Sequence, residues 1–207
     1  MIHQLDVNSA FLNGLLAEEI YVEQPDGFST PGKEDQVYLL TKALYGLKQA
    51  PRAWYERMDN HLIQLGFSRS QSEATLYVKV NDAGESLIVS IYVEDMLVTG
   101  SKIELIQRFK DEIEKIFEMT DLRVMKYFLG MQVLQSSNGI FICQQKYISD
   151  ILNRFKMQDC EPMSTQNSIG VKLCKDEDFD KMKDCIYRIL IGNLLYLTAN
   201  KPDIRYV

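Results

Sequence analysis

An apolar run that ends at two adjacent acidic residues is the feature that most constrains the fold of this chain. Residues 87–93 read LIVSIYV, and a second apolar run, MLVTG at 96–100, follows Glu94 and Asp95 directly. Short runs rich in Val and Ile and ended by glycine are typical of buried strands. With only Glu94 and Asp95 between them, the two runs are predicted to form a tight hairpin whose tip carries both carboxylates.

The predicted tip departs from the usual sequence of a two-residue hairpin loop. Such loops favour Asn-Gly or Asp-Gly because their central residues often have positive φ, and Glu-Asp offers no glycine. A water-exposed acidic tip is the simpler interpretation, but local rules are broken most often at functional sites. Two carboxylates beside buried strands need cations, and Mg²⁺ prefers such oxygen ligands. We therefore expect a metal site here, with a third carboxylate from another strand.

Composition predicts a globular protein of one or two domains. The chain has 207 residues, of which 46% are hydrophobic and 25% charged, and its formal net charge is −6. These values are ordinary for a soluble protein. The acidic balance gives no overall attraction to nucleic acid, so any such binding has to come from a local patch.

The sequence also predicts where the protein resides. Its four cysteines form no Cys-x-x-Cys pair, which favours reduced intracellular thiols over disulfides or a zinc site. The first residues lack the features of a secretory signal. No apolar run approaches the ~20 residues needed to cross a bilayer. We therefore expect an intracellular, cytoplasmic protein that is not secreted and has no membrane partner.

Apolar periodicity and turn residues predict an α+β order of elements. Strands are predicted at 2–7, 20–22, 37–40, 75–80 and 86–93, and a further hairpin from 127–133 and 139–143. Helices are predicted at 51–65, from Ser101 as N-cap to 116, at 147–155 and at 186–197. An α+β layer followed by a helical unit from about residue 140 is the expected arrangement.

Residues 42–57 form a locally basic stretch in which aromatic residues alternate with cations. The cations are Lys42, Lys48, Arg52 and Arg57, and the aromatic residues are Tyr45, Trp54 and Tyr55. Two interpretations remain open at this point. The stretch is a binding surface, or it is the solvated start of a helix whose aromatic residues pack in the core.

Five blocks of the sequence, in this order, resemble copia-type (Ty1/copia) LTR retrotransposon reverse transcriptases. They are LDVNSAFLNG at 5–14, LYGLKQAPRAWY at 44–55, YVED at 92–95, YFLG at 127–130 and KPDI at 201–204. The chain is therefore identified as a member of this family and as a fragment of a Pol polyprotein. The resemblance implies a right-hand polymerase: a palm with an antiparallel sheet and packed helices, a mostly helical thumb, and incomplete fingers. Residues 1–140 would be the palm with partial fingers, and 141–207 the thumb or connection start.

The resemblance implies an RNA-directed DNA polymerase, which is a nucleotidyltransferase. Its substrates would be deoxynucleotides and a primed RNA or DNA template. The reaction would use two Mg²⁺ ions, with Mn²⁺ as an alternative. Asp6, Glu94 and Asp95 match the catalytic metal ligands, and Asp6 supplies the third carboxylate. The family also implies a cytoplasmic virus-like particle, while protein partners are left open.

Further positions match the family's nucleotide-binding residues. Phe11 matches the bulky side chain that excludes a 2′-hydroxyl group, the alternative being an ordinary core aromatic residue. Gly46, Lys48 and Gln49 match contacts to the incoming nucleotide and the template. Glycine would allow close backbone approach there, and Lys48 could meet a phosphate.

A later block resembles the hairpin that grips the primer end. Its residues are Phe128, Leu129 and Gly130, and the alternative is a plain β-hairpin. The helix at 145–157 would then belong to the thumb.

Three departures from the family pattern predict impaired activity. Glu94 replaces the leading Asp of the signature, and a shift of roughly an ångström in a catalytic group can cost about a hundredfold in rate. Arg123 and Gln166 stand where the family has Gly and Pro. The basic segment that precedes Asp6 in the family is missing. We expect a fragment of a decayed element; the alternative is a non-catalytic remnant or interaction module that keeps the palm fold.

Overall fold

The computed structural model describes residues 1–163, 184–201, 203 and 204, so Gln166 lies outside the described residues. The chain divides into two compact units, Met1–Met125 and Lys126–Val207. The predicted boundary after residue 140 would cut through a hairpin of the second unit, because residues 131–136 pair with residues 139–143. The names palm, fingers and thumb stay predictions for these units.

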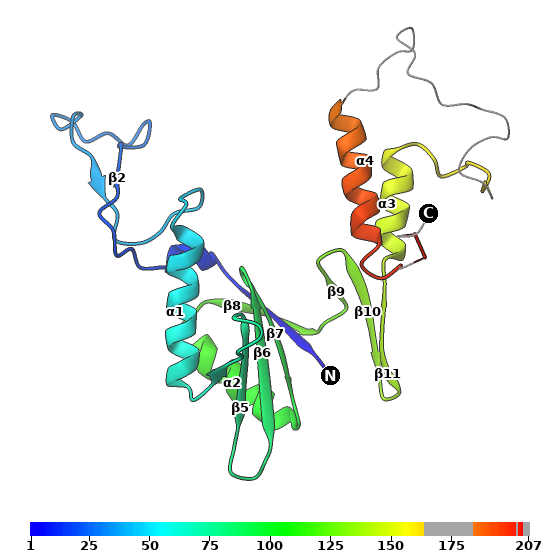
Figure 1. The fold of residues 1–207 in the computed structure, drawn as a ribbon. Helices are drawn as coiled ribbons and strands as arrows, with labels where there is room; N and C mark the ends of the chain where they lie inside the picture. Colours follow the sequence, from blue (N-terminus) through cyan, green and yellow to red (C-terminus); the bar gives the residue numbers. More distant parts are fainter. Residues whose placement is uncertain (164–183, 202, 205–207) are drawn as a thin grey trace, which may run out of the picture. The chain divides into compact units, whose positions relative to one another are not determined.

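The first unit is built on a six-stranded antiparallel sheet with the order β4-β5-β6-β7-β1-β8 (Figure 1). Its strands are β1 (His3–Val7), β4 (Ser68–Arg69), β5 (Leu76–Val80), β6 (Ser86–Tyr92), β7 (Asp95–Gly100) and β8 (Met119–Val124). The N-terminal strand β1 lies between β7 and β8, which are distant from it in sequence. This insertion brings the first acidic block beside the hairpin of β6 and β7.

Two helices, α1 (Ala50–Gln64) and α2 (Ile103–Glu114), pack on one face of this sheet. Their apolar residues and the strand residues form one core, which includes Leu5, Trp54, Met58, Val89 and Ile113. Successive side chains of a strand point to opposite faces of the sheet. Residues that alternate with the core positions therefore lie on the face away from the helices.

Local sequence explains the ends of α1 but not the start of α2. Pro51 lies in the first turn of α1, and Gly66 follows the helix with φ 84°, as expected for helix-ending residues. The prediction that Ser101 caps α2 is wrong, because Lys102 is the N-cap residue. The Ser101 hydroxyl instead donates to the Ser86 carbonyl oxygen at 3.0 Å and accepts the Ser86 N–H at 2.7 Å.

Residues 8–49 link β1 to α1. They contain a 3₁₀ helix, η1 (Ala10–Asn13), and the two-stranded pair β2 (Tyr21–Val22) and β3 (Tyr38–Leu39), both close to their predicted positions. After η1, Gly14 approaches α1 so closely that an added Cβ would lie 2.8 Å from the Trp54 backbone nitrogen. Glycine is therefore required for this contact.

Among its described residues, the second unit has a three-stranded sheet, β11-β10-β9, and two α-helices. Its elements are β9 (Tyr127–Phe128), β10 (Met131–Ser136), β11 (Gly139–Cys143), α3 (Gln145–Arg154) and α4 (Asp184–Leu197). The prediction of one continuous strand at 127–133 is wrong. Leu129 and Gly130 have φ 46° and 79°, and two successive positive values make a tight turn that separates β9 from β10.

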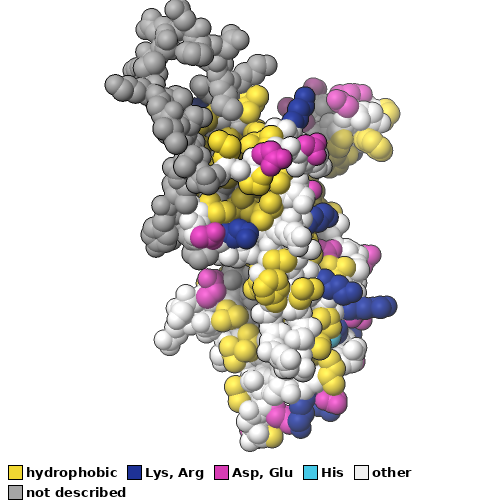
Figure 2. Space-filling view, turned by 90° about the vertical axis from the view of Figure 1, so that its right-hand side faces the viewer, with side chains coloured by type: hydrophobic (Ala, Val, Ile, Leu, Met, Phe, Trp, Pro, Cys, Tyr) yellow, Lys and Arg dark blue, Asp and Glu magenta, His cyan; other side chains and the backbone are white. Residues whose placement is uncertain are grey.

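Apolar side chains remain on the surface of both units. Figure 2 shows hydrophobic side chains scattered between charged ones over the face that it displays. In the second unit, Leu134 and Phe141 are both more than half exposed. Within the described part of the chain, no helix has the length and apolarity to span a bilayer. The mixture of helices and a large antiparallel sheet confirms the predicted α+β class.

Candidate active site

Asp6 and Asp95 lie directly opposite each other on the neighbouring strands β1 and β7. Opposed residues of an antiparallel pair have Cβ atoms about 4.5–5.5 Å apart. The Val7 N–H donates to the Glu94 carbonyl oxygen at 2.9 Å, so β1 also contacts the turn itself. The structure thus brings Asp6 beside the acidic hairpin, although the two segments are far apart in sequence.

The turn of this hairpin lies one residue earlier than predicted. Tyr92 pairs with Asp95, so the two loop residues are Val93 and Glu94, and Asp95 is the first residue of β7. Val93 has φ 56°. Positive φ at the first loop position is typical of a type II′ turn, which normally has glycine there. A β-branched residue in this conformation costs about 1–3 kcal/mol, so the predicted strain is present, but at Val93.

The Asp6 carboxylate lies in an environment that disfavours its charge. Partial burial raises the pKa of Asp6, and the negative charge of Asp95 raises it further. Asp95 is held by Gln4, whose Nε2 donates to Asp95 Oδ1 at 2.8 Å. Gln4 is 9% exposed. Sequence reasoning missed Gln4, and the only signal was its place two positions before Asp6, which puts both side chains on the same face of β1.

The Glu94 side chain does not join this pair. Its Oε2 accepts a hydrogen bond from the Tyr45 hydroxyl at 3.5 Å, and the side chain is exposed. Among the described residues, no group of three His, Cys, Asp or Glu side chains is placed to hold one metal ion. The structure therefore brings together two of the three predicted metal ligands and leaves the third carboxylate beside them, on the turn.

Phe11 and Tyr45 form an aromatic pair next to these acids. Their ring centroids are 4.9 Å apart, and Phe11 is half-buried. Burial raises the pKa of Tyr45, and the charges of Glu94 and Asp6 raise it further, which places this tyrosine near both acids. The pair forms an apolar wall beside the carboxylates.

Trp54 contacts the turn from the helix side of the sheet. Its indole Nε1 donates to the Val93 carbonyl oxygen at 2.6 Å, and the residue is 2% exposed. Of the two interpretations of the basic stretch, Trp54 fits the core one, while Tyr45 is exposed and faces the acids. No pattern in the sequence indicates that this tryptophan touches the acidic hairpin.

Comparison with known proteins identifies the family. The family described as "Reverse transcriptase (RNA-dependent DNA polymerase)" matches residues 1–168. The chain belongs to this family. The predicted resemblance to copia-type retrotransposon enzymes is thereby confirmed.

Individual reverse transcriptase relatives are retrotransposon proteins. The Pol polyprotein from transposon TNT 1-94 of Nicotiana tabacum is 37% identical over 99% of this chain, and that from RE1 of Arabidopsis thaliana is 38% identical over 99%. The putative transposon Ty5-1 protein of Saccharomyces cerevisiae is 36% identical over 98% of this chain and 66% of its own length. The chain spans only 16% of the tobacco polyprotein and 14% of the RE1 polyprotein.

The positions that resemble the family's nucleotide contacts lie just before α1. Gly46 has φ 91°, and an added Cβ would meet nothing within 4 Å, so the backbone here is open to approach. Lys48 is exposed, and Gln49 is the N-cap residue of α1. These three residues are accessible on the same segment as Tyr45.

Two of the four cationic side chains in the basic stretch make an ion pair or a hydrogen bond within the protein. Arg52 pairs with Glu56 at 2.8 Å on the surface of α1. Arg57 donates to the Asn13 carbonyl oxygen at 2.6 Å and lies over the Phe117 ring. The helical interpretation therefore accounts for these two residues.

Arg123, which the sequence analysis singled out as a departure from the family pattern, has an unusual backbone conformation. It has φ 66°, and it lies where the pairing of β8 with β1 shifts in register. Its N–H donates to Asp121 Oδ1 at 2.8 Å. The residue is therefore in the conformation that glycine adopts without steric cost.

The three residues that resemble a primer grip form the β9–β10 turn in the second unit. The Leu129 carbonyl oxygen accepts a hydrogen bond from the Tyr196 hydroxyl. A Cβ at Gly130 would lie 3.2 Å from the same tyrosine ring. Phe128 ends β9 and pairs with Met131. Helix α4 thus supports this turn within its own unit.

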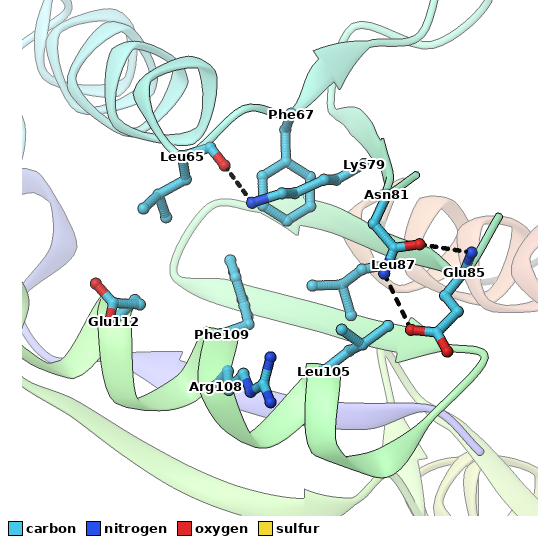
Figure 3. A pocket seen from close by; sticks show the side chains of 10 residues that line it. All are labelled: Leu65, Phe67, Lys79, Asn81, Glu85, Leu87, Leu105, Arg108, Phe109 and Glu112. Carbon is cyan, nitrogen blue, oxygen red and sulfur yellow. Dashed lines mark hydrogen bonds between the residues drawn. The ribbon is translucent and has the colours of Figure 1, made fainter. Parts of the chain in front are cut away.

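A separate cavity of about 260 Å³ lies between the end of α1, α2 and the β5–β6 hairpin (Figure 3). Its floor is apolar, with Phe67 and Phe109 among its residues. Lys79 on its rim donates to the Leu65 carbonyl oxygen at 2.6 Å, and Glu112 pairs with Lys115 outside it. The predicted site residues do not line this cavity.

Proposed function

We propose that this chain is the part of a retrotransposon polymerase that extends a primed RNA or DNA template with deoxynucleotides. The observation that carries the proposal is the register of β1 and β7, which sets Asp6 opposite Asp95. The family's first block and its Tyr-Val-Asp-Asp block thus meet at one point. The polymerase activity, its substrates and its partners are proposed here, because the chain spans only a small part of the related polyproteins.

The Asp6–Asp95 pair suits a divalent cation. Two carboxylates on opposed positions repel each other, and the raised pKa of Asp6 reflects this repulsion together with burial. A hard cation such as Mg²⁺, or Mn²⁺ in its place, prefers such oxygen ligands. Asp6 and Asp95 would hold it, and Glu94 would be the third ligand. The family's reaction uses a second ion of the same kind. When bound, the two ions would stabilise the attacking 3′-oxygen and the leaving pyrophosphate.

Other residues near the pair would bind the substrates. Phe11, packed against Tyr45, would exclude nucleotides that carry a 2′-hydroxyl group. Lys48 would attract phosphate, while Gly46 and Gln49 would contact the nucleotide or template through an accessible backbone and amide. Phe128, Leu129 and Gly130 would grip the primer end.

A non-catalytic remnant is the second candidate. Glu94 supports it, because its carboxylate contacts Tyr45 and lies outside the Asp6–Asp95 pair. A misplacement of roughly an ångström can lower the rate by about a hundredfold. We propose that this copy is impaired for that reason.

Primer extension on poly(rA)–oligo(dT) with Mg²⁺ or Mn²⁺ distinguishes the two candidates. We expect weak incorporation by the chain, none by Asp6→Asn, and an increase of up to about a hundredfold in Glu94→Asp. Incorporation that Asp6→Asn abolishes would exclude the remnant. If Glu94→Asp also fails to incorporate nucleotides with both ions, the polymerase proposal is wrong.

A further inference from the structure

The turn between β6 and β7 is held by contacts from three different segments. Trp54 on α1 binds the Val93 carbonyl oxygen, and the Val7 N–H on β1 binds the Glu94 carbonyl oxygen. Tyr45 reaches the Glu94 side chain at the longer distance of 3.5 Å. The contact from Trp54 is the shortest of the three, and its donor is buried.

Val93 gives the turn a strained backbone, which such a contact can hold in place. Its φ of 56° is unfavourable for a β-branched residue, so a relaxed turn is available to the free chain. Two-residue turns of types I′ and II′ differ in the orientation of the central peptide, whose carbonyl group here belongs to Val93. A donor fixed on this carbonyl oxygen therefore selects one turn conformation over the other.

Trp54 is itself fixed in place. Its ring packs edge-on against Phe117, with centroids 5.3 Å apart and planes at 87°. Gly14 lies against the Trp54 backbone nitrogen, where no Cβ would fit. The indole N–H therefore has little freedom to follow the turn if the turn relaxes.

We propose that Trp54 is a positioning residue, which holds the strained Val93–Glu94 turn so that Asp95 faces Asp6 and Glu94 stays beside them on the turn. The role in metal binding rests on the proposed function, whereas the hold on the turn does not. Through Trp54, the helix that follows Lys48 and Gln49 is connected to the backbone that carries the acids. The side chain at residue 54 would then influence how tightly Asp6 and Asp95 bind a cation, although it does not itself contact the cation.

The first test is hydrogen exchange measured by NMR on the whole chain. Trp54→Phe keeps a buried aromatic ring and removes the donor. We expect the Val7 amide and the amides of 92–97 to exchange about tenfold faster, because one net hydrogen bond no longer holds the turn. Amides of β5 and α2 should keep their rates.

Tyr77→Phe is the matched control. The Tyr77 hydroxyl donates to Asp59 Oδ1 at 2.7 Å, and this residue is fully buried in the same core. Tyr77→Phe removes one hydrogen bond donated by a buried aromatic side chain, as Trp54→Phe does, but this bond lies away from the turn. Exchange at 92–97 should therefore stay at the wild-type rate in Tyr77→Phe.

The second test is titration with Mn²⁺ alone, followed by the electron paramagnetic resonance signal of the free ion. We expect binding by the wild type and by Tyr77→Phe, binding about tenfold weaker in Trp54→Phe, and none at this site in Asp6→Asn. Trp54 is the single tryptophan of the chain, so quenching of its fluorescence by Mn²⁺ should follow the same curve in the wild type.

The outcomes separate this inference from the proposed function. Unchanged exchange at the turn in Trp54→Phe, or equal acceleration in Tyr77→Phe, overturns the inference. Equal Mn²⁺ affinity in Trp54→Phe and wild type also overturns it, while the metal site stands. If Trp54→Phe exchanges faster only at the turn, the role of Trp54 in holding the turn is supported. If Asp6→Asn then still binds Mn²⁺ as the wild type does, the proposed function is contradicted.

Discussion

Besides Val93, Asp6 and Arg123 are in energetically unfavourable positions for identifiable reasons. Asp6 faces a second carboxylate across two strands, and Arg123 has a backbone conformation suited to glycine. A raised carboxyl pKa means that the folded state binds the proton more tightly than the unfolded chain. The contribution of Asp6 to stability therefore becomes less favourable as the pH rises through that pKa. Each cost can be measured by substituting one side chain.

Asp6→Asn should stabilise the protein at neutral pH without divalent cations. Like charges on opposed strand positions cost about 0.2–1 kcal/mol, and the amide removes this repulsion. Urea unfolding at neutral and at acidic pH tests the prediction, and the gain should shrink in acid, where Asp6 is protonated. Asp82→Asn, in the β5–β6 loop, is the control and should change little. A destabilised Asp6→Asn at neutral pH would contradict the prediction.

Arg123→Gly should also stabilise the protein. At φ 66°, a side chain costs on the order of 1 kcal/mol that glycine avoids. The free energy of unfolding in urea should rise by about that amount. Arg108→Gly, within α2, should lower it by about 1 kcal/mol because helical glycine is unfavourable. Losses of similar size in both variants would show that Arg123 is not strained.

At the scale of elements, one buried lysine connects α2 to two strands. Lys110 is 4% exposed, and its Nζ donates to Asp121 Oδ2 on β8 at 2.9 Å and lies 3.2 Å from His3 Nδ1 on β1. Burial raises the pKa of Asp121, but hydrogen bonds from Lys110 and from the Arg123 N–H outweigh it, so this pKa is lowered. Burial and then the Lys110 charge lower the pKa of His3.

Lys110→Met should destabilise the protein by about 1–3 kcal/mol at neutral pH, because Asp121 loses its buried partner. A lowered carboxyl pKa gives stability that is present above the unfolded-state pKa and lost as the pH falls through the folded-state pKa. The difference between wild type and variant should therefore shrink in acid, as urea unfolding at several pH values would show. Lys115→Met breaks an exposed ion pair and should cost at most about 1 kcal/mol. A pH-independent difference would contradict this account.

At the scale of the whole molecule, the chain divides into two compact units. The main core, from Leu5 to Phe117, lies entirely within Met1–Met125. The β9–β10 turn is supported by α4 of its own unit. The first unit therefore contains the apolar residues that its sheet needs, and each unit is expected to unfold by itself.

Residues 1–125 alone should fold cooperatively, as measured by circular dichroism and urea unfolding. Met58→Ala removes a fully buried side chain and should cost about 2–5 kcal/mol in the fragment and in the first-unit transition of the whole chain. Equal losses would show that the unit is independent. An unfolded fragment, or a much smaller loss in the whole chain, would contradict the prediction.

Much of the fold followed from local sequence, and some of the site did not. Pro51 and Gly66 predicted the ends of α1, and short apolar runs on either side of a turn predicted β5 and β6. Apolar periodicity missed the Leu129–Gly130 turn because one apolar run continues through it, whereas the resemblance of 128–130 to a hairpin indicated it. The Gln4–Asp95 and Trp54–Val93 contacts join segments far apart in the chain, and periodicity carries no information about such pairs.

The sequence by itself determined the family, the α+β class and the residue types of the candidate site, because these depend on local patterns and on the order of blocks. The tertiary structure alone decided that Asp6 faces Asp95, that Val93 takes the strained turn position and that Glu94 contacts Tyr45. Strand register and helix packing fix these contacts. Both result from burying one shared core, which is a property of the whole first unit and not of any segment within it.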